Sequence, residues 1–168
     1  MQASRTILAL CALGLTASAL ADVPARSDIE PVLLVISNQD FYYREYADTR
    51  SSLEVQGLDV VVAAATIEVA RPHAGPGAPV HPDLSLAEVS ADDYSGIVFA
   101  GGWGMAQYQY GFEGTYHNSA YRPTPELSLT MHRVINEFVE ADRPIGAISN
   151  GVSVLAYARV DGVSLLKG

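Results

Sequence analysis

Cysteine and lysine are almost missing from this chain of 168 residues, where Cys11 and Lys167 are the only examples. Because Cys11 lies in an N-terminal segment that we expect to be cleaved, the mature protein should have no disulfide, no thiol nucleophile and no cysteine metal ligand. Acidic residues outnumber Lys and Arg by 19 to 10, which gives a net charge of −9. An acidic chain without a basic cluster is a poor binder of nucleic acid and of anionic membranes.

The segment from Met1 to Ala21 has the pattern of a secretory signal peptide. Arg5 provides a positive start, an apolar stretch follows, and Ala19-Leu20-Ala21 is a small-x-small cleavage site. The apolar stretch is shorter than the ~20 residues needed to span a bilayer. We therefore expect cleavage after Ala21, a periplasmic or secreted protein without a membrane attachment, and a flexible leader at residues 22–30.

Residues 31–168 are expected to form one domain of alternating strands and helices. Continuous apolar runs predict strands that are buried on both faces, and amphipathic runs predict helices. We expect strands at residues 31–36, 58–65, 95–100 and 144–148, and helices at residues 42–56, 125–141 and 152–157, with a short helix within residues 83–92. This order is typical of a three-layer α/β sandwich with a mostly parallel sheet, whose ligands bind at the carboxyl ends of the strands.

Loops that begin at Ser37, Gly101 and Ser149 reach this edge of the sheet. At Ser149 a strand turns abruptly into a helix, which places the serine where a nucleophile would lie, beside the free N–H groups and the positive dipole end of the helix. Gly101 and Gly102 follow another buried strand and allow backbone N–H groups to approach a ligand. Neither a complete GxGxxG pattern nor a P-loop is present, so we expect no nucleotide and no other cofactor.

A segment dense in aromatic residues follows Gly102, with Trp103, Tyr108 and Tyr110 as candidate ligand contacts. Such side chains can stack on a sugar or close over a ligand, or they can pack on one another as an insertion. His73 and His81 lie in a segment rich in Pro and Gly, and no carboxylate or cysteine lies between them. We therefore expect no metal site.

Four segments, in this order, resemble the DJ-1/PfpI family of the class I glutamine amidotransferase-like superfamily. They are the first strand-helix-strand unit with Glu45, the segment from Asp93 to Gly102, the segment from Arg143 to Gly151, and the tail from Asp161 to Gly168. The resemblance covers residues 32–168 and implies a flavodoxin-like sandwich and a homodimer. Members include glyoxalase- and deglycase-type enzymes, peptidases, isocyanide hydratases, chaperones and redox sensors.

The family motif Ala-Ile-Cys-His-Gly corresponds to Ala147-Ile148-Ser149-Asn150-Gly151 in this chain. The resemblance therefore implies that Ser149 replaces the nucleophilic cysteine and Asn150 the histidine, with Glu45 as the acidic residue placed against the nucleophile. Gly102 and the N–H of Asn150 match the oxyanion-binding backbone groups. Family members continue beyond the segment that matches the tail, so we expect the C-terminal part of the domain to be truncated.

These replacements change the expected chemistry. A serine hydroxyl gains little from the field that activates a thiol and needs a general base. Asn150 cannot be that base, and a carboxylate such as Glu45 is a poor activator without a histidine. The leading hypothesis is an exported pseudoenzyme that binds a small ligand or a partner without Cys-dependent catalysis. The alternatives are a serine-dependent hydrolase or lyase that uses Ser149 with Glu45, and a glycan- or peptide-binding module that uses the aromatic segment.

Overall fold

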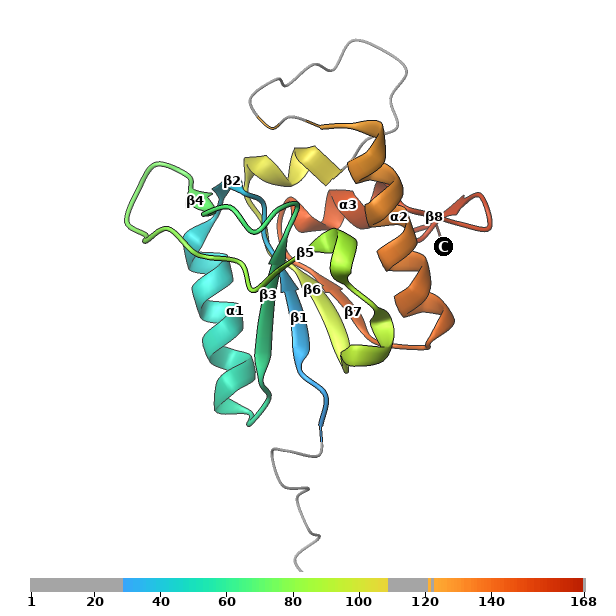
Figure 1. Cartoon of the computed structure of the whole chain (residues 1–168), viewed down its shortest axis with the longest axis horizontal. Helices are drawn as coiled ribbons and strands as arrows, with labels where there is room; N and C mark the ends of the chain where they lie inside the picture. The colour runs from blue at the N-terminus through green and yellow to red at the C-terminus, as the bar shows by residue number, and fades with distance from the viewer. Residues whose placement is uncertain (1–28, 109–120, 122, 168) are drawn as a thin grey trace, which may run out of the picture.

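The computed structural model of the chain describes residues 29–108, 121 and 123–167, so the expected signal peptide and most of the leader lie outside it. Five parallel strands form the central sheet in the order β5-β3-β1-β6-β7 (Figure 1). The strands are β1 (Val32–Val35), β3 (Val60–Ala64), β5 (Leu84–Ser85), β6 (Gly96–Phe99) and β7 (Ile145–Ala147). All four strands that the sequence predicts are therefore present in this sheet.

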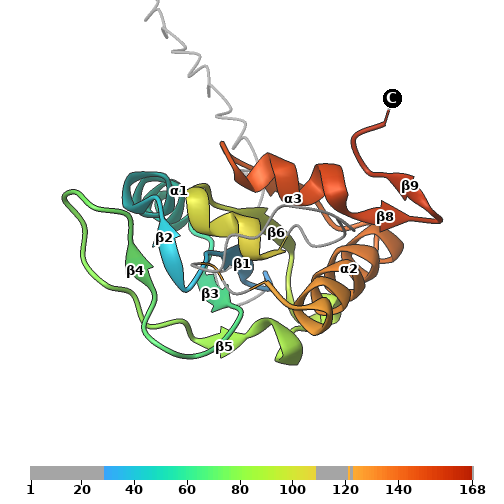
Figure 2. The ribbon, with the colours of Figure 1, turned by 90° about the horizontal axis from the view of Figure 1, so that it is seen from above.

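Three α-helices pack against the sheet: α1 (Tyr43–Val55), α2 (Pro125–Glu140) and α3 (Gly151–Tyr157). Figures 1 and 2 show α1 and α2 on opposite sides of the sheet, which confirms the flavodoxin-like three-layer arrangement. Shorter 3-10 helices are η2 (Leu86–Glu88), η3 (Ala91–Asp93) and η4 (Trp103–Tyr108). None of the helices in the described ranges is long and apolar enough to cross a membrane.

Strand β1 and the residue after it are buried on both faces of the sheet, as the unbroken apolar sequence predicts. Leu33 and Val35 contribute to a core cluster that also contains side chains of α2 and α3. Leu34 and Ile36 contribute to a second cluster, which contains Tyr46 of α1. All four aliphatic side chains are fully buried, so this central segment forms a common wall of the two apolar layers.

Residues 83–92 contain a short helix, as the sequence predicts, but it is the 3-10 helix η2 of three residues, and a strand that was not predicted precedes it. Leu84 and Ser85 form β5, which pairs in parallel with the end of β3. The chain then turns through η2, where the Glu88 carboxylate accepts hydrogen bonds from the Ser85 hydroxyl at 2.7 Å and from the Ser85 N–H at 3.0 Å. Pairing with the sheet edge therefore replaces helix formation at the start of this segment.

Two short strands lie where the sequence predicts a turn and an irregular loop. β2 (Gln39–Phe41) and β4 (Arg71–Pro72) form a parallel pair beside the central sheet. The N–H of His73 then donates to the carbonyl of Phe41 at 2.9 Å. This pairing fixes the backbone of His73 next to the start of α1.

The described chain ends with an antiparallel hairpin of β8 (Arg159–Val160) and β9 (Val163–Ser164), which follows α3.

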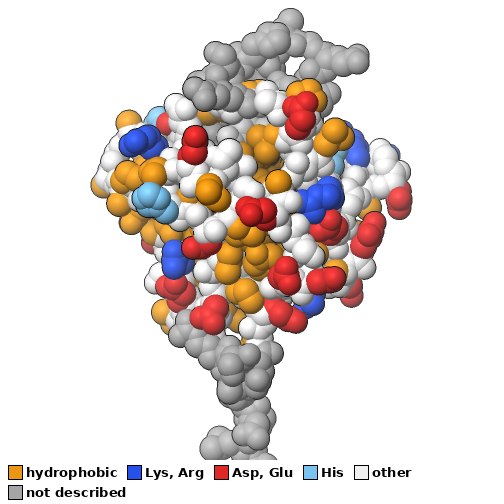
Figure 3. All heavy atoms as spheres, in the orientation of Figure 1, with side chains coloured by type: hydrophobic (Ala, Val, Ile, Leu, Met, Phe, Trp, Pro, Cys, Tyr) orange, Lys and Arg blue, Asp and Glu red, His pale blue; other side chains and the backbone are white. Residues whose placement is uncertain are grey.

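On the face of the molecule in Figure 3, acidic side chains are spread over the surface with few basic ones between them. This distribution agrees with the net charge of −9. The face shown therefore has no extended basic patch of the kind that binds nucleic acid.

Candidate functional site

Ser149 occupies the tight turn between β7 and α3. Its φ angle is 52°, in the left-handed region that residues other than glycine rarely adopt. The N–H of Gly151 donates to the carbonyl of Ile148 at 2.8 Å, and the N–H of Val152 donates to the carbonyl of Ser149 at 3.1 Å. Ser149 itself is exposed. The sharp strand-to-helix turn that the sequence predicts is therefore present, with the serine at its apex.

Glu45, in the first turn of α1, lies against Ser149 across Gly101. A Cβ atom built on Gly101 would collide with Glu45 Oε2 and would lie 2.7 Å from Ser149 Cβ. Glycine is therefore needed here to let the two side chains approach. Glu45 Oε2 is buried and has no hydrogen-bond partner among the described residues, which costs free energy unless a proton or a ligand satisfies it. The structure brings the acidic residue and the serine together, but this oxygen accepts no hydrogen bond from the Ser149 hydroxyl.

Both side chains line a cavity of about 330 Å³ at the carboxyl edge of the sheet. Its walls are Tyr42, Glu45, His73, Gly102, Trp103, Ser149 and Asn150. Five of these residues are candidates from the sequence, and their convergence follows from the parallel sheet, which brings loops after different strands to one edge. Tyr42 and His73 were not predicted as site residues.

Two backbone N–H groups at this cavity, those of Gly102 and Asn150, have no acceptor within the described ranges. Gly102 has a φ angle of 115°, and a Cβ atom on it would lie 2.7 Å from Phe41 Cα, so a side chain is excluded there. The Asn150 side-chain amide donates to the carbonyl of Gly102 at 3.4 Å, which links the two segments. Backbone N–H groups without an acceptor can bind the oxygen of a carbonyl or carboxylate group.

His73 adds an imidazole to the cavity from a segment in which the sequence predicts no metal site. Its Nδ1 lies 3.9 Å from Asp40 Oδ1, and Asp40 Oδ2 accepts a hydrogen bond from the Tyr121 hydroxyl at 3.0 Å. The His73 side chain is about half exposed, at 48%. No group of three or more His, Cys, Asp or Glu suited to a metal ion occurs in the described part of the chain. The nearest ionisable side chain recorded for His73 is therefore Asp40.

The aromatic segment after Gly102 is divided between surface and core. Trp103 is 63% exposed at the cavity, where it can contact a ligand. Tyr108 is buried instead, and its hydroxyl donates to the carbonyl of Ile36 at 2.7 Å. Burial raises the pKa of this phenol well above its usual range. Tyr108 therefore presents no face to a ligand, contrary to the expectation from sequence, and Tyr110 lies outside the described residues.

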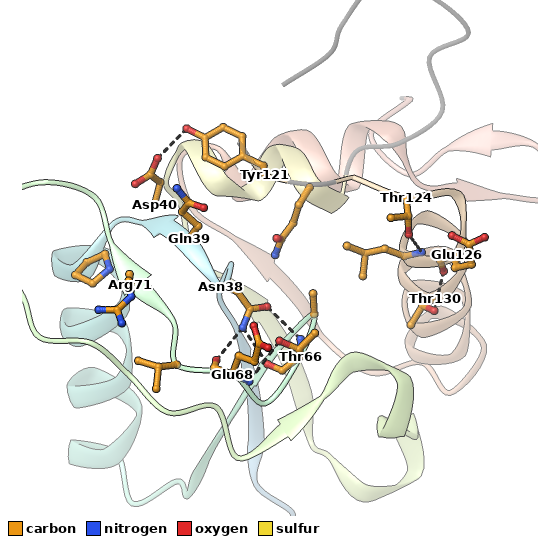
Figure 4. Close-up of a pocket in the computed structure, with 15 residues that line it drawn as sticks. Asn38, Gln39, Asp40, Thr66, Glu68, Arg71, Tyr121, Thr124, Glu126 and Thr130 are labelled. Carbon is orange, nitrogen blue, oxygen red and sulfur yellow. Dashed lines mark hydrogen bonds between the residues drawn. The ribbon is translucent and has the colours of Figure 1, made fainter. Parts of the chain in front are cut away.

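A second, larger cavity of about 780 Å³, which Asp40 lines, lies between the loops after β1 and β3 and the start of α2 (Figure 4). The Asn38 side chain connects these two loops: its amide donates to the carbonyls of Thr66 and Glu68 at 3.0 and 2.9 Å, and its oxygen accepts from the N–H of Thr66 at 3.1 Å. Figure 4 shows the Tyr121 ring directed at Asp40. Asp40 therefore lines the larger cavity and lies near His73 of the smaller one.

The comparison with curated proteins gives a distant relative of unknown activity. No family model matches the chain. An uncharacterized protein from Archaeoglobus fulgidus is 27% identical over 130 residues, which cover 75% of this chain and 64% of the relative. The chain therefore spans just under two thirds of the length of the curated relative that it matches.

Several solved structures with the same fold carry DJ-1 or ThiJ/PfpI in their names. A ThiJ/PfpI domain protein from Brachyspira murdochii superimposes with a TM-score of 0.63 at 22% identity, over 77% of this chain and 64% of that one. A DJ-1 superfamily protein from Agrobacterium tumefaciens has a TM-score of 0.55 at 19% identity, over 76% and 57% of the two chains. Drosophila melanogaster DJ-1beta has a TM-score of 0.53 at 21% identity, over 77% and 60%. The resemblance predicted from the sequence is thus confirmed at the level of the fold: the chain has the α/β fold of these DJ-1 and ThiJ/PfpI structures.

Proposed function

We propose that this domain binds a small ligand with a carbonyl or carboxylate group in the Ser149 cavity and performs no Cys-dependent catalysis. The observation that carries the proposal is the pair of N–H groups of Gly102 and Asn150, which have no acceptor among the described residues and lie at the same cavity as Ser149. The buried oxygen of Glu45 can accept a hydrogen bond only from a donor group of the ligand, such as a hydroxyl. A volume of about 330 Å³ is at the lower end of the range for small-molecule sites, about 300–1,000 Å³.

The proposed absence of Cys-dependent turnover follows from the side chains at the turn. A thiol is partly ionised near neutral pH, and a helix N-terminus increases that fraction. The hydroxyl of Ser149 gains almost nothing from the same field, and Asn150 cannot exchange a proton in place of the family's histidine. We therefore expect no consumption of methylglyoxal by the wild type. If the double variant Ser149→Cys with Asn150→His consumes methylglyoxal, the rest of the cavity is intact.

Ligand binding can be measured with the only tryptophan of the chain, Trp103, which lines the cavity. We expect pyruvate, as a probe that carries both groups, to change the Trp103 fluorescence in a saturable way. Gly101→Ala should abolish this change, because the added Cβ collides with Glu45 and Ser149. Gly146→Ala is the matched control, since its Cβ would lie at an ordinary 3.5 Å from Val98. Binding that survives in Gly101→Ala, or is absent from the wild type, would refute the proposal.

A second candidate function is a serine-dependent hydrolase or lyase that uses Ser149 with Glu45. It is favoured by the φ angle of 52° at Ser149, because strained backbone conformations of this kind cluster at functional sites. A fluorophosphonate probe should then label the wild type and fail to label Ser149→Ala. Equal labelling of both proteins, or none of either, would exclude this candidate.

We also propose that the protein is exported and forms a homodimer. The motivation is the signal-peptide pattern of residues 1–21 and the family resemblance. Mass spectrometry of the protein recovered from the periplasm or medium should give Asp22 as the first residue, and light scattering should give twice the mass of the mature chain. A product that keeps Met1 would contradict the proposed export. A monomer at micromolar concentration would contradict the proposed homodimer.

A further inference from the structure

We propose that His73, oriented by Asp40, is the proton acceptor of this cavity and gives it ester hydrolysis through Ser149. The inference rests on the proposed function, because the same cavity must bind the carbonyl group. It differs from the second candidate above in the base: an imidazole from a distant loop takes the part assigned there to Glu45.

The position of His73 is set by backbone pairing. The N–H of His73 donates to the carbonyl of Phe41 at 2.9 Å, immediately after the β2–β4 pair. Phe41 is followed by Tyr42, which also lines the cavity. The imidazole is therefore anchored at the same wall as the start of α1, and it lines the cavity together with Ser149.

Asp40 orients the ring. Its Oδ1 lies 3.9 Å from His73 Nδ1, and its Oδ2 accepts from the Tyr121 hydroxyl at 3.0 Å. With Nδ1 on the side of the carboxylate, Nε2 is the nitrogen left to accept a proton from a nucleophile. The distance of 3.9 Å exceeds that of a hydrogen bond, but catalytic hydrogen bonds often shorten only when substrate is bound. The carboxylate also stabilises the positive charge that the ring acquires.

The other titratable groups near the ring do not fill this role as well. Glu45 Oε2 is buried against Gly101, and this oxygen accepts no hydrogen bond from the Ser149 hydroxyl. Tyr42 is a poor proton acceptor because its hydroxyl oxygen already carries a proton and is weakly basic. Arg71, two residues before His73, has no free lone pair for a proton. His73 combines a lone pair, a neighbouring carboxylate and access to solvent.

The reaction is a two-step acyl transfer in which atoms and protons balance. The Ser149 oxygen attacks the ester carbonyl carbon while its proton moves to His73, and the N–H groups of Gly102 and Asn150 hold the developing oxyanion. The tetrahedral intermediate breaks its bond to the alcohol oxygen, which takes the proton from His73. Water then attacks the acyl-serine, gives a proton to His73 and releases the carboxylic acid. The ring returns this proton to the Ser149 oxygen.

The test uses the full chain with p-nitrophenyl acetate as the probe, and acetylation of Ser149 is measured by mass spectrometry. Ser149→Ala should abolish acetylation at this position, and His73→Gln should slow it by about 10²–10⁴-fold. His81→Gln is the matched control, because His81 is an exposed histidine of the same segment that does not line the cavity. It should react like the wild type. Asp40→Asn should slow the reaction less than His73→Gln does, because it disturbs only the orientation of the ring.

The pH profile distinguishes the two possible bases. With an imidazole base, the rate of acetylation should fall as the pH decreases between about 8 and 5, the range in which imidazole side chains change charge. A carboxylate base would keep its activity through this range. Unchanged acetylation in His73→Gln, or no acetylation of a wild type that still binds pyruvate, would overturn the inference alone. A wild type that binds no pyruvate would overturn the proposed function as well.

Discussion

Ser149 holds a side chain at a backbone angle that suits glycine, and the strain should be measurable. At a φ of 52° a Cβ atom costs about 1–2 kcal/mol relative to glycine. Ser149→Ala and Ser149→Gly both remove the hydroxyl, but only glycine also relieves this strain. We expect the glycine variant to have the higher free energy of unfolding, by about 1 kcal/mol, after the greater entropy of glycine in the unfolded chain is subtracted. Urea titrations followed by circular dichroism measure the difference.

Asp142 supplies a control for this measurement at a place away from the cavity. Its φ angle is also 52°, and it is exposed after the end of α2. The pair Asp142→Ala and Asp142→Gly should therefore show a similar difference. Equal stabilities of the two Ser149 variants, beside a clear difference at Asp142, would show that the Ser149 turn relaxes without strain.

Some site residues are predicted from the sequence and others are not, because different features of the fold determine their positions. Ser149, Asn150 and Gly102 follow buried strands, and a parallel sheet brings such positions to one edge. Glu45 was identified through the family resemblance, and it lines the same cavity as Ser149. His73 joins them through the pair of β2 and β4, which have three and two residues. Segments this short have no detectable periodicity, so no sequence pattern indicates that His73 lies at the cavity.

The start of α2 depends on a side-chain cap. The Thr124 hydroxyl accepts a hydrogen bond from the N–H of Leu127 at 3.1 Å, and Pro125 follows as the first helical residue. Thr124→Ala should lower the free energy of unfolding by about 1 kcal/mol, because the N–H loses its acceptor. Urea denaturation detects a loss of this size.

Thr130, within the same helix, is the matched control. Its hydroxyl donates to the carbonyl of Glu126 at 2.9 Å, which already has a place in the helix ladder, and alanine has the higher helix propensity. Thr130→Ala should leave the stability unchanged or raise it slightly. A loss at Thr130 as large as that at Thr124 would mean that threonine packing, and not capping, stabilises this helix.

Long elements follow from the sequence and short ones do not. The apolar run of β1 and the amphipathic run of α2 each contain enough residues to reveal a period or a continuous buried stretch. β5 has only Leu84 and Ser85, and it forms because β3 offers it a free edge. Whether these two residues form a strand depends on β3, about twenty residues earlier in the chain. A local sequence pattern contains no information about this pairing.

Buried tyrosines should make the folded protein less stable at alkaline pH. Burial raises the pKa of Tyr108, and burial together with Asp93 and Asp83 raises that of Tyr94. Because the folded state retains these protons more strongly, their contribution to stability is complete below the ordinary tyrosine pKa of ~10 and is lost as the pH rises above it. We expect the midpoint of urea unfolding to decrease above about pH 10.

Tyr108→Phe tests the source of this sensitivity. The variant should reduce the alkaline decrease, because one of the raised phenols is gone. At pH 7 it should cost about 1–3 kcal/mol, because the carbonyl of Ile36 loses its donor. Tyr42→Phe, at an exposed ring, should leave the stability at pH 7 unchanged. If Tyr108→Phe has the wild-type decrease above pH 10, other groups control alkaline unfolding.

The central segment of β1 also decides how the domain unfolds. Leu33 and Val35 belong to one apolar cluster, and Leu34 and Ile36 to the other. If this segment leaves the sheet, both layers lose their inner wall at the same moment, so neither can persist as a folded intermediate. We therefore expect unfolding to be all-or-none in the part of the chain described, with one shared midpoint for Trp103 fluorescence and circular dichroism.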